Sequence, residues 1–231
     1  MCIKYYLNTD DSGISTVFVT GRSEYWLEKV RLEISPPLGR EIVDIDDYID
    51  LEQTIGLGFD FVNSEDFQVI FSKMTKNRFI KDLGIHNCHI DLKFDCCLTL
   101  DHLYIGENVN IDMTSWNIIT NKVTLLSLKT FKGYFSSSIP SVEELTIWDD
   151  KDRLNEILKV FYNIKTLSLT NSNIEDLDVK NLLRLIEANL AYCKKLKTIE
   201  ANKQNEIKKI ILRRCNKYIP SKEMKNLVIR I

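Results

Sequence analysis

The sequence predicts an α/β solenoid, in which the parallel strands of successive repeats stack into one sheet and short helices and loops connect them. Three observations lead to this fold class. An apolar phrase of the form Φ-x-x-Φ-x-Φ-x-x-(Cys/Asn), where Φ is an apolar residue, recurs from about residue 54 to residue 231. The copies follow one another at short, similar intervals, as in solenoid repeats. Each copy alternates apolar and polar residues, which is typical of a strand with one buried face.

The first segment, residues 1–53, does not fit the repeat. Two apolar runs flank the turn sequence NTDDSG, which predicts a β-hairpin. A further strand is predicted in KVRLEI, and Pro36 and Pro37 end it. Because a stack of repeats exposes apolar edges at its ends, we interpret residues 1–53 as an N-terminal β cap.

Residues 54–231 carry eight to nine copies of the phrase. In the clearest copy, the apolar and Cys/Asn positions are occupied by Leu185, Ala188, Leu190, Cys193, Leu196 and Ile199. Strand centres are expected at Leu57, Leu83, Leu103, Leu126, Leu145, Leu167, Ala188, Ile210 and Leu227. Spacings of 17 to 26 residues between these centres are too short for repeats built from pairs of helices. With 44% apolar residues, this segment can bury the core of one continuous solenoid domain.

Two return segments between strands have helical periodicity. In SEDFQVIFSKM, Ser64 can cap a helix whose apolar face comprises Phe67, Ile70, Phe71 and Met74. In KDRLNEILKVFYNI, the apolar face comprises Leu154, Ile157, Leu158 and Phe161. Short convex-side helices are therefore predicted at both places.

The repeated phrase resembles that of the leucine-rich repeat family, most of all the irregular Cys- and Asn-containing repeats of its bacterial and F-box-type members. The resemblance covers roughly residues 54–231. The turn position of the repeat is held by Cys88, Asn108, Cys193 and Cys215. It departs from the usual Cys or Asn at Phe131, Asp150 and Ser172. The resemblance implies a curved solenoid whose parallel sheet lies on the concave side as a binding surface, with short helices and loops on the convex side. It implies no catalysis, because members with enzyme activity carry it in attached domains.

The alternation of strand residues predicts which side chains face the concave side. Tyr104 and Trp148 are the favoured contacts, since exposed aromatic side chains on a rigid sheet are enriched in binding hot spots. The alternative is that they fold against their neighbours on a face that binds nothing. The full set of expected partner-binding residues is His86, His102, Tyr104, Lys129, Glu144, Trp148, Arg213 and Arg230.

Charge is distributed unevenly, although the formal net charge is only −2. Residues 1–66 contain 14 Asp and Glu against 5 Lys and Arg, whereas residues 194–231 contain 3 against 12. In a solenoid, position in the sequence maps onto position along the long axis, so one acidic end and one basic end are expected. The acidic end includes Asp44, Asp46, Asp47 and Asp50.

The sequence offers no targeting signal and no disulfide framework. The N-terminus lacks the features of a secretory signal, and no apolar run approaches membrane-spanning length. Three of the six cysteines occupy turn positions of the repeat, and the others are Cys2, Cys96 and Cys97. Reduced thiols and a cytoplasmic location are therefore expected.

A zinc site is the main alternative chemistry, because His and Cys residues cluster in the sequence. The cluster comprises His86, Cys88, His89, Cys96, Cys97 and His102. A structural role is favoured, since Cys88 is a turn residue and neighbouring strand side chains point to opposite faces. A Cys96 or Cys97 nucleophile beside His102 is disfavoured in the same way, because adjacent apolar thiols usually pack.

Other cofactor motifs are incomplete. Gly56 and Gly58 lack the third glycine of a dinucleotide fingerprint, and the Asp44 to Asp50 cluster lacks the glycine and terminal glutamate of an EF-hand loop. No cofactor and no metal are expected, and a zinc-dependent enzyme remains an alternative. Nucleic acid is a disfavoured partner, because Tyr218 is the only aromatic residue among the basic residues Lys208, Lys209, Arg213, Arg214 and Arg230.

These features predict a non-enzymatic protein-binding module. Our hypothesis is a cytoplasmic immunity or antitoxin-like protein that neutralises a bacterial toxin by direct binding, for which a basic nuclease would suit the acidic end. The alternatives are a leucine-rich repeat adaptor or substrate receptor and a host-directed effector. No membrane partner is expected. A homodimer through the C-terminal edge strand LVIRI is compatible with each reading.

Overall fold

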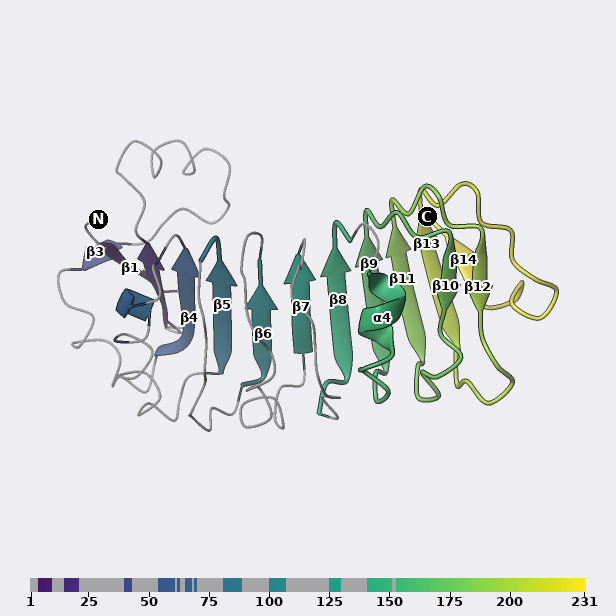
Figure 1. Ribbon diagram of the computed structural model, residues 1–231, viewed down its shortest axis with the longest axis horizontal. Helices are drawn as coiled ribbons and strands as arrows, with labels where there is room; N and C mark the ends of the chain where they lie inside the picture. Colours follow the sequence, from purple (N-terminus) through teal and green to yellow (C-terminus); the bar gives the residue numbers. More distant parts are fainter. Residues whose placement is uncertain are drawn as a thin grey trace.

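The computed structural model describes residues 4–9, 15–20, 40–42, 54–60, 62, 65–67, 69, 81–88, 100–106, 125–129, 141–150 and 153–231. A 12-stranded sheet runs the length of the molecule, with strands of successive coils side by side (Figure 1). The predicted strands of the repeat are β4 (Thr54–Asp60), β5 (Asp82–His86), β6 (His102–Ile105), β7 (Leu125–Lys129), β8 (Glu144–Trp148), β9 (Thr166–Thr170), β11 (Glu187–Ala191), β13 (Lys209–Arg213) and β14 (Val228–Arg230). Each pairs in parallel with the next, which confirms the parallel-strand solenoid.

The predicted N-terminal hairpin is present. Strands β1 (Lys4–Thr9) and β2 (Ser15–Thr20) pair antiparallel, and β2 joins the large sheet by pairing in parallel with β4. The outermost strand is β3 (Arg40–Ile42), which pairs antiparallel with β1. The sequence did not indicate β3, whose three residues are too few to show a period. The strand expected in KVRLEI lies outside the described residues, and the capping role of residues 1–53 stays a prediction.

Inward strand side chains form two columns of the core, and residues of the turns and return segments, such as Cys88 and Phe161, also belong to it. The first column follows positions that are aligned across eight successive strands, at Leu57, Leu83, Leu103, Leu126, Leu145, Leu167, Ala188 and Ile210. The side chain of Leu126 is outside the described part of the structure. A second inward column contains Phe59, Ile85, Ile105, Leu128, Ile147, Leu169, Leu190 and Leu212, all of them buried. Full burial of one such side chain contributes about 1.5–3 kcal/mol. These contacts join neighbouring coils, so each coil depends on the next for its core.

The expected register fails only at the last strand. Val228, and not Leu227, pairs with Ile210, and Arg230 consequently stands beside Leu212. The predicted placement of Arg230 among the concave residues is therefore wrong by one position. In LVIRI, apolar residues occur at positions that point to either face of the strand, so the hydrophobic pattern does not define one register. A slip of one residue moves every side chain of the strand to the opposite face.

The same turn ends five of the described strands. The first residue after each strand has a positive φ of 49° to 57°, and these residues are Asn87, Asp149, Asn171, Tyr192 and Arg214. The next residue is buried in each case, and these are Cys88, Asp150, Ser172, Cys193 and Cys215. The turn position of the repeat is thus confirmed at the three cysteines, and Asp150 and Ser172 take the same place. Asn108 and Phe131 lie outside the described residues.

The buried turn residues bond to the backbone around them. The Cys88 thiol donates to the carbonyl oxygen of His86 at 3.1 Å, and Cys193 and Cys215 likewise donate to the carbonyl two residues earlier. The three cysteines are free thiols. A hydrogen bond with the Cys215 thiol and burial raise the pKa of Cys193, and the hydrogen bond with Cys193 lowers the pKa of Cys215.

The predicted return-side helices are present where the chain is described. Helix α4 (Leu154–Leu158) buries Leu154, Ile157 and Leu158, and Phe161 follows in the core. Residues 65–67 and 69 are also helical, and the ring of Phe67 packs on Phe59 with centroids 4.4 Å apart. None of the helices in the described ranges is long and apolar enough to cross a membrane.

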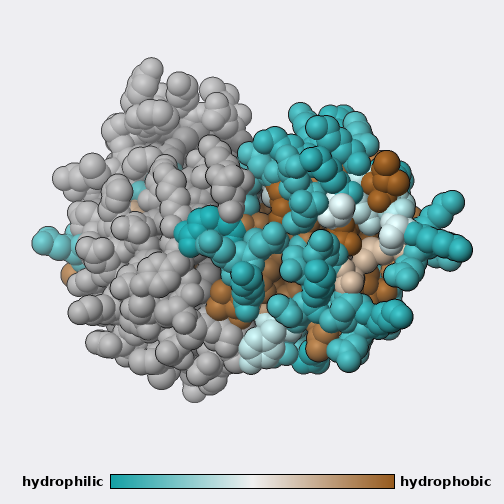
Figure 2. Space-filling model, turned by 45° about the vertical axis from the view of Figure 1, so that its right-hand side comes forward, coloured by the Kyte–Doolittle hydropathy of each residue, from teal (hydrophilic) through white to brown (hydrophobic). Residues whose placement is uncertain are grey.

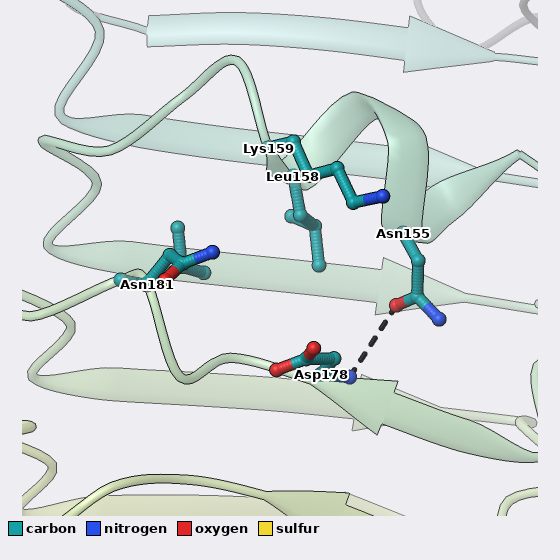
Figure 3. Close-up of a pocket in the computed structure, with 6 residues that line it drawn as sticks. Asn155, Leu158, Lys159, Asp178 and Asn181 are labelled. Carbon is teal, nitrogen blue, oxygen red and sulfur yellow. Dashed lines mark hydrogen bonds between the residues drawn. The ribbon is translucent and has the colours of Figure 1, made fainter.

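A second, two-stranded sheet on the return side was not predicted. It pairs β10 (Asp176–Asp178) with β12 (Thr198–Glu200) in parallel. Asn155 of α4 extends this sheet, because its Oδ1 accepts from the Asp178 amide at 3.3 Å (Figure 3). Its Nδ2 also donates to the Asp176 carbonyl at 3.2 Å. The hollow beside Asn155 has a volume of about 30 Å³, which is room for a single water molecule.

Hydrophilic side chains cover most of the coloured surface in Figure 2, with small apolar areas between them. Several of these side chains form ion pairs between neighbouring coils, such as Lys165 with Glu143 at 2.7 Å and Lys180 with Glu200 at 2.5 Å. These pairs are exposed, so each contributes little to stability. The core columns and the turns stabilise the fold.

The first prediction concerns Asp150, which is 7% exposed. Its carboxylate accepts from the amides of Arg153 and Leu154 at 3.4 and 3.2 Å, at the start of α4. We expect Asp150→Ala to lower the free energy of unfolding by about 1–2 kcal/mol, because these helix amides lose their acceptor. Urea unfolding measures this. Asp150→Asn retains one acceptor and should cost less, and Glu156→Ala, an exposed change in the same helix, should cost less than about 0.5 kcal/mol. Equal losses in all three variants would contradict the assignment.

Candidate binding site on the open face of the sheet

The open face is the side of the large sheet opposite the core, formed by the alternate, mostly half-exposed strand positions. Cross-strand register places seven of the predicted binding residues on it: His86, His102, Tyr104, Lys129, Glu144, Trp148 and Arg213. The side chain of Lys129 is outside the described part of the structure. Arg230 departs from the set, because its guanidinium donates to the carbonyls of Cys215 and Tyr218 at 3.5 and 2.6 Å.

An aromatic row crosses the open face. The rings of Tyr104 and Trp148 lie edge to face with centroids 6.1 Å apart, and the His86 ring lies 6.5 Å from that of Tyr104. All three side chains are half-exposed. Sequence analysis singled out Tyr104 and Trp148, and the structure brings them together.

Gly106 makes room for the His86 ring. A Cβ at Gly106 would lie 2.1 Å from Cδ2 of His86 and 3.1 Å from the Tyr104 ring, so any side chain there would displace the imidazole. On its other side, His86 Nδ1 lies 3.2 Å from Oδ1 of Asp60, a residue that is 6% exposed. The amide of Asn87 donates to the same oxygen at 3.1 Å. The imidazole is therefore held between Gly106 and a buried carboxylate.

A hollow of about 190 Å³ lies next to the aromatic row. Its floor includes the backbone of β4 and β5 at three open-face positions that are glycines, namely Gly56, Gly58 and Gly84. The residues that line it are Gly56, Leu57, Gly58, Asp82, Leu83, Gly84, His102 and Tyr104. Three glycines on neighbouring strands leave the sheet without side chains there. The larger side chains of Asp82 on β5 and of His102 and Tyr104 on β6 form the wall.

Asp82 and His102 occupy paired positions on β5 and β6 at this wall. Burial raises the pKa of Asp82 above its ordinary 3.8; His102 opposes this shift and Asp101 adds to it. Burial lowers the pKa of His102 below its ordinary 6.5, and Asp82 opposes that shift. At neutral pH the imidazole is therefore neutral. The wall of the hollow carries one acidic side chain, that of Asp82.

Sequence analysis missed Asp60, Asp82 and the glycine floor. Gly56 and Gly58 were considered only as part of a nucleotide motif. A signal was present, because strand register aligns Gly58 with Gly84 and Asp60 with His86 across 26 residues. It becomes visible only when neighbouring coils are laid side by side.

The described residues of the candidate zinc cluster do not lie together. The His86 ring lies on the open face, whereas the Cys88 thiol is buried in the core. His89, Cys96 and Cys97 lie outside the described residues. Within the described ranges, no group of three or more His, Cys, Asp or Glu side chains could hold a metal ion.

At the basic end, several charged side chains already have contacts. Lys209 lies 3.5 Å from Glu187, and the guanidinium of Arg214 lies 5.4 Å from the Tyr192 ring centre. Tyr218 is buried, so it belongs to the core and cannot stack on a base. Arg213 is exposed on the open face. The acidic cluster Asp44, Asp46, Asp47 and Asp50 lies outside the described residues.

Comparisons with protein-family models, with curated proteins and with solved structures give no match for this chain.

The second prediction concerns the pH dependence of stability. The lowered pKa of His102 means that the unfolded chain binds more protons than the folded one in the window below 6.5, so this contribution to stability is lost as the pH falls through that window. The chain has only three histidines, so the change can be assigned. We expect His102→Gln to flatten the dependence of the urea midpoint between pH 7.5 and 5.5. Parallel profiles for the variant and the wild type would contradict this.

Proposed function

We propose that this chain is an irregular leucine-rich repeat protein that binds another protein through the open face of its sheet. The turn geometry supports the family. Three of the five described turn positions carry the Cys of that family, and Asp150 and Ser172 occupy the same buried place. The strand spacing of about 20 residues supports it as well.

The observation that carries the binding role is the aromatic row of His86, Tyr104 and Trp148. Tyrosine and tryptophan are enriched in binding hot spots. These rings are half-exposed and already restrained by one another, by the Gly106 backbone and by a rigid parallel sheet. Binding would therefore cost them little conformational freedom, which favours affinity.

Binding without a reaction is the role we propose for this face. A catalytic nucleophile needs a base within hydrogen-bonding reach. The thiol nearest to His86 in the sequence, Cys88, is buried on the other side of the strand and donates to the His86 carbonyl, away from the imidazole. The two His–Asp pairs of the open face are instead suited to orienting side chains that contact a partner.

Within this binding role, we propose a cytoplasmic immunity or antitoxin-like protein that neutralises a bacterial toxin directly. The support is the charge distribution of the sequence, which changes from 14 acidic against 5 basic residues in residues 1–66 to 3 against 12 in residues 194–231. Charge complementarity accelerates encounter and selects the partner. A basic toxin such as a nuclease would match the acidic end.

The third prediction tests the aromatic row. Immobilised wild-type protein, the double variant Tyr104→Ala/Trp148→Ala and the control Tyr162→Ala are incubated with nuclease-treated lysate of the source organism, and recovered proteins are identified by mass spectrometry. Tyr162 is a matched control, because it is an exposed aromatic residue on the return side. We expect a partner with the wild type and the control only. Loss of a hot spot costs at least about 2 kcal/mol, or about 30-fold in Kd, measured by calorimetry.

Two outcomes would contradict the proposal at different levels. Equal affinity of all three proteins for the partner would remove the aromatic row as the binding site. A partner whose activity is unchanged at saturating concentrations of this protein would exclude neutralisation but retain binding. Stoichiometric inhibition of a basic, toxic enzyme is the expected result.

A further inference from the structure

We propose that the glycine-floored hollow of β4, β5 and β6 receives one arginine side chain of the partner protein. The inference rests on the proposed function and deepens it, because it names the chemistry that this part of the open face recognises. Three features carry it: the size of the hollow, its flat floor beside an aromatic ring, and its charge.

Size restricts the occupant. Pockets for cofactors and drug-sized molecules have volumes of about 300–1,000 Å³. The hollow has about 190 Å³, which is too small for such a ligand and has room for one large side chain. Because it opens on the face that carries the aromatic row, a side chain of a protein docked on that row can reach it.

Shape favours a flat group. The Gly56, Gly58 and Gly84 positions present bare strand backbone, so a planar group can lie close to the sheet. The Tyr104 ring stands at the edge, and a Cβ built on Gly84 would lie 3.9 Å from its Cδ1 atom. A guanidinium is planar and stacks on aromatic rings, whereas an ammonium is a compact, strongly hydrated charge.

Charge selects a cation. Asp82 is the acidic side chain of the lining, Asp101 lies near it, and His102 adds no positive charge at neutral pH because burial lowers its pKa. None of the eight lining residues, all within the described part of the chain, is lysine or arginine. Arginine can pair with a carboxylate through two parallel hydrogen bonds, and such bonds are strongest where water is partly excluded. A basic partner supplies that group.

The direct test uses ¹⁵N-labelled protein titrated with N-acetyl-arginine amide. N-acetyl-citrulline amide is the matched probe, because it has nearly the same shape and no charge. We expect saturable shifts of the Gly84, Asp82 and His102 resonances with the arginine probe only. Asp82→Asn should weaken this binding about tenfold or more, since it removes a charge-assisted pair. Equal responses to both probes, or no saturable shift at these residues, would overturn the proposal.

A second variant separates loss of the site from loss of the fold. Gly84→Ala places a methyl group in the hollow, with its nearest neighbours at 3.9 Å, so it causes no clash. Replacing glycine in a strand also restricts the unfolded chain, so stability should be retained or increased. We expect a stable protein with weakened arginine binding. The control is Ser168→Ala, a small residue at an equivalent open-face position of β9, which should bind as the wild type does.

The partner experiment distinguishes the two proposals. If Tyr104→Ala/Trp148→Ala loses the partner while Asp82→Asn and Gly84→Ala bind it as the wild type does, the open face is the binding site and the arginine pocket is wrong. If no partner is recovered but the arginine probe binds at Asp82 and Gly84, the pocket stands and the proposed protein-binding role loses its support.

Discussion

Every part of this structure depends on the contact between equivalent inward side chains of neighbouring coils. A single coil contributes two inward strand residues, such as Leu167 and Leu169, and cannot bury them alone. Stacking buries them against the same positions of the coils before and after. Because strand side chains alternate, fixing the inward columns also fixes the open-face columns. The aromatic row and the glycine floor are therefore positioned by the core.

The turn that follows a strand leads the chain out of the sheet and into the return segment. A residue at positive φ directs the next side chain into the core, where Cys88, Cys193 or Cys215 donates to a nearby carbonyl. Where the return segment is helical, Asp150 replaces the thiol and accepts from the helix amides. The departure from the repeat pattern at this position thus follows from local structure, since amides need an acceptor and carbonyls need a donor.

The sequence predicted most of the fold, because the period of the core columns is repeated many times. It predicted the open-face position of Tyr104 and Trp148 for the same reason. The prediction failed where repetition gives no information. The segment of β14 has apolar residues at positions that point to either face, and β10 and β12 have only three residues each. Strand β3 lies outside the repeat. It missed the hollow because Gly58 and Gly84 form a floor only by lying side by side, 26 residues apart in sequence.

The open face changes in character along the solenoid, and this bears on how a partner would sit. Its N-terminal half combines the glycine hollow, the carboxylates of Asp60 and Asp82 and the aromatic row. Small polar or apolar residues such as Ser168, Asn189 and Ala191 follow, and exposed Arg213 lies near the far end. A uniformly aromatic face would permit many orientations. A face with an anionic, aromatic half and a cationic end favours one, because the reversed orientation brings like charges together.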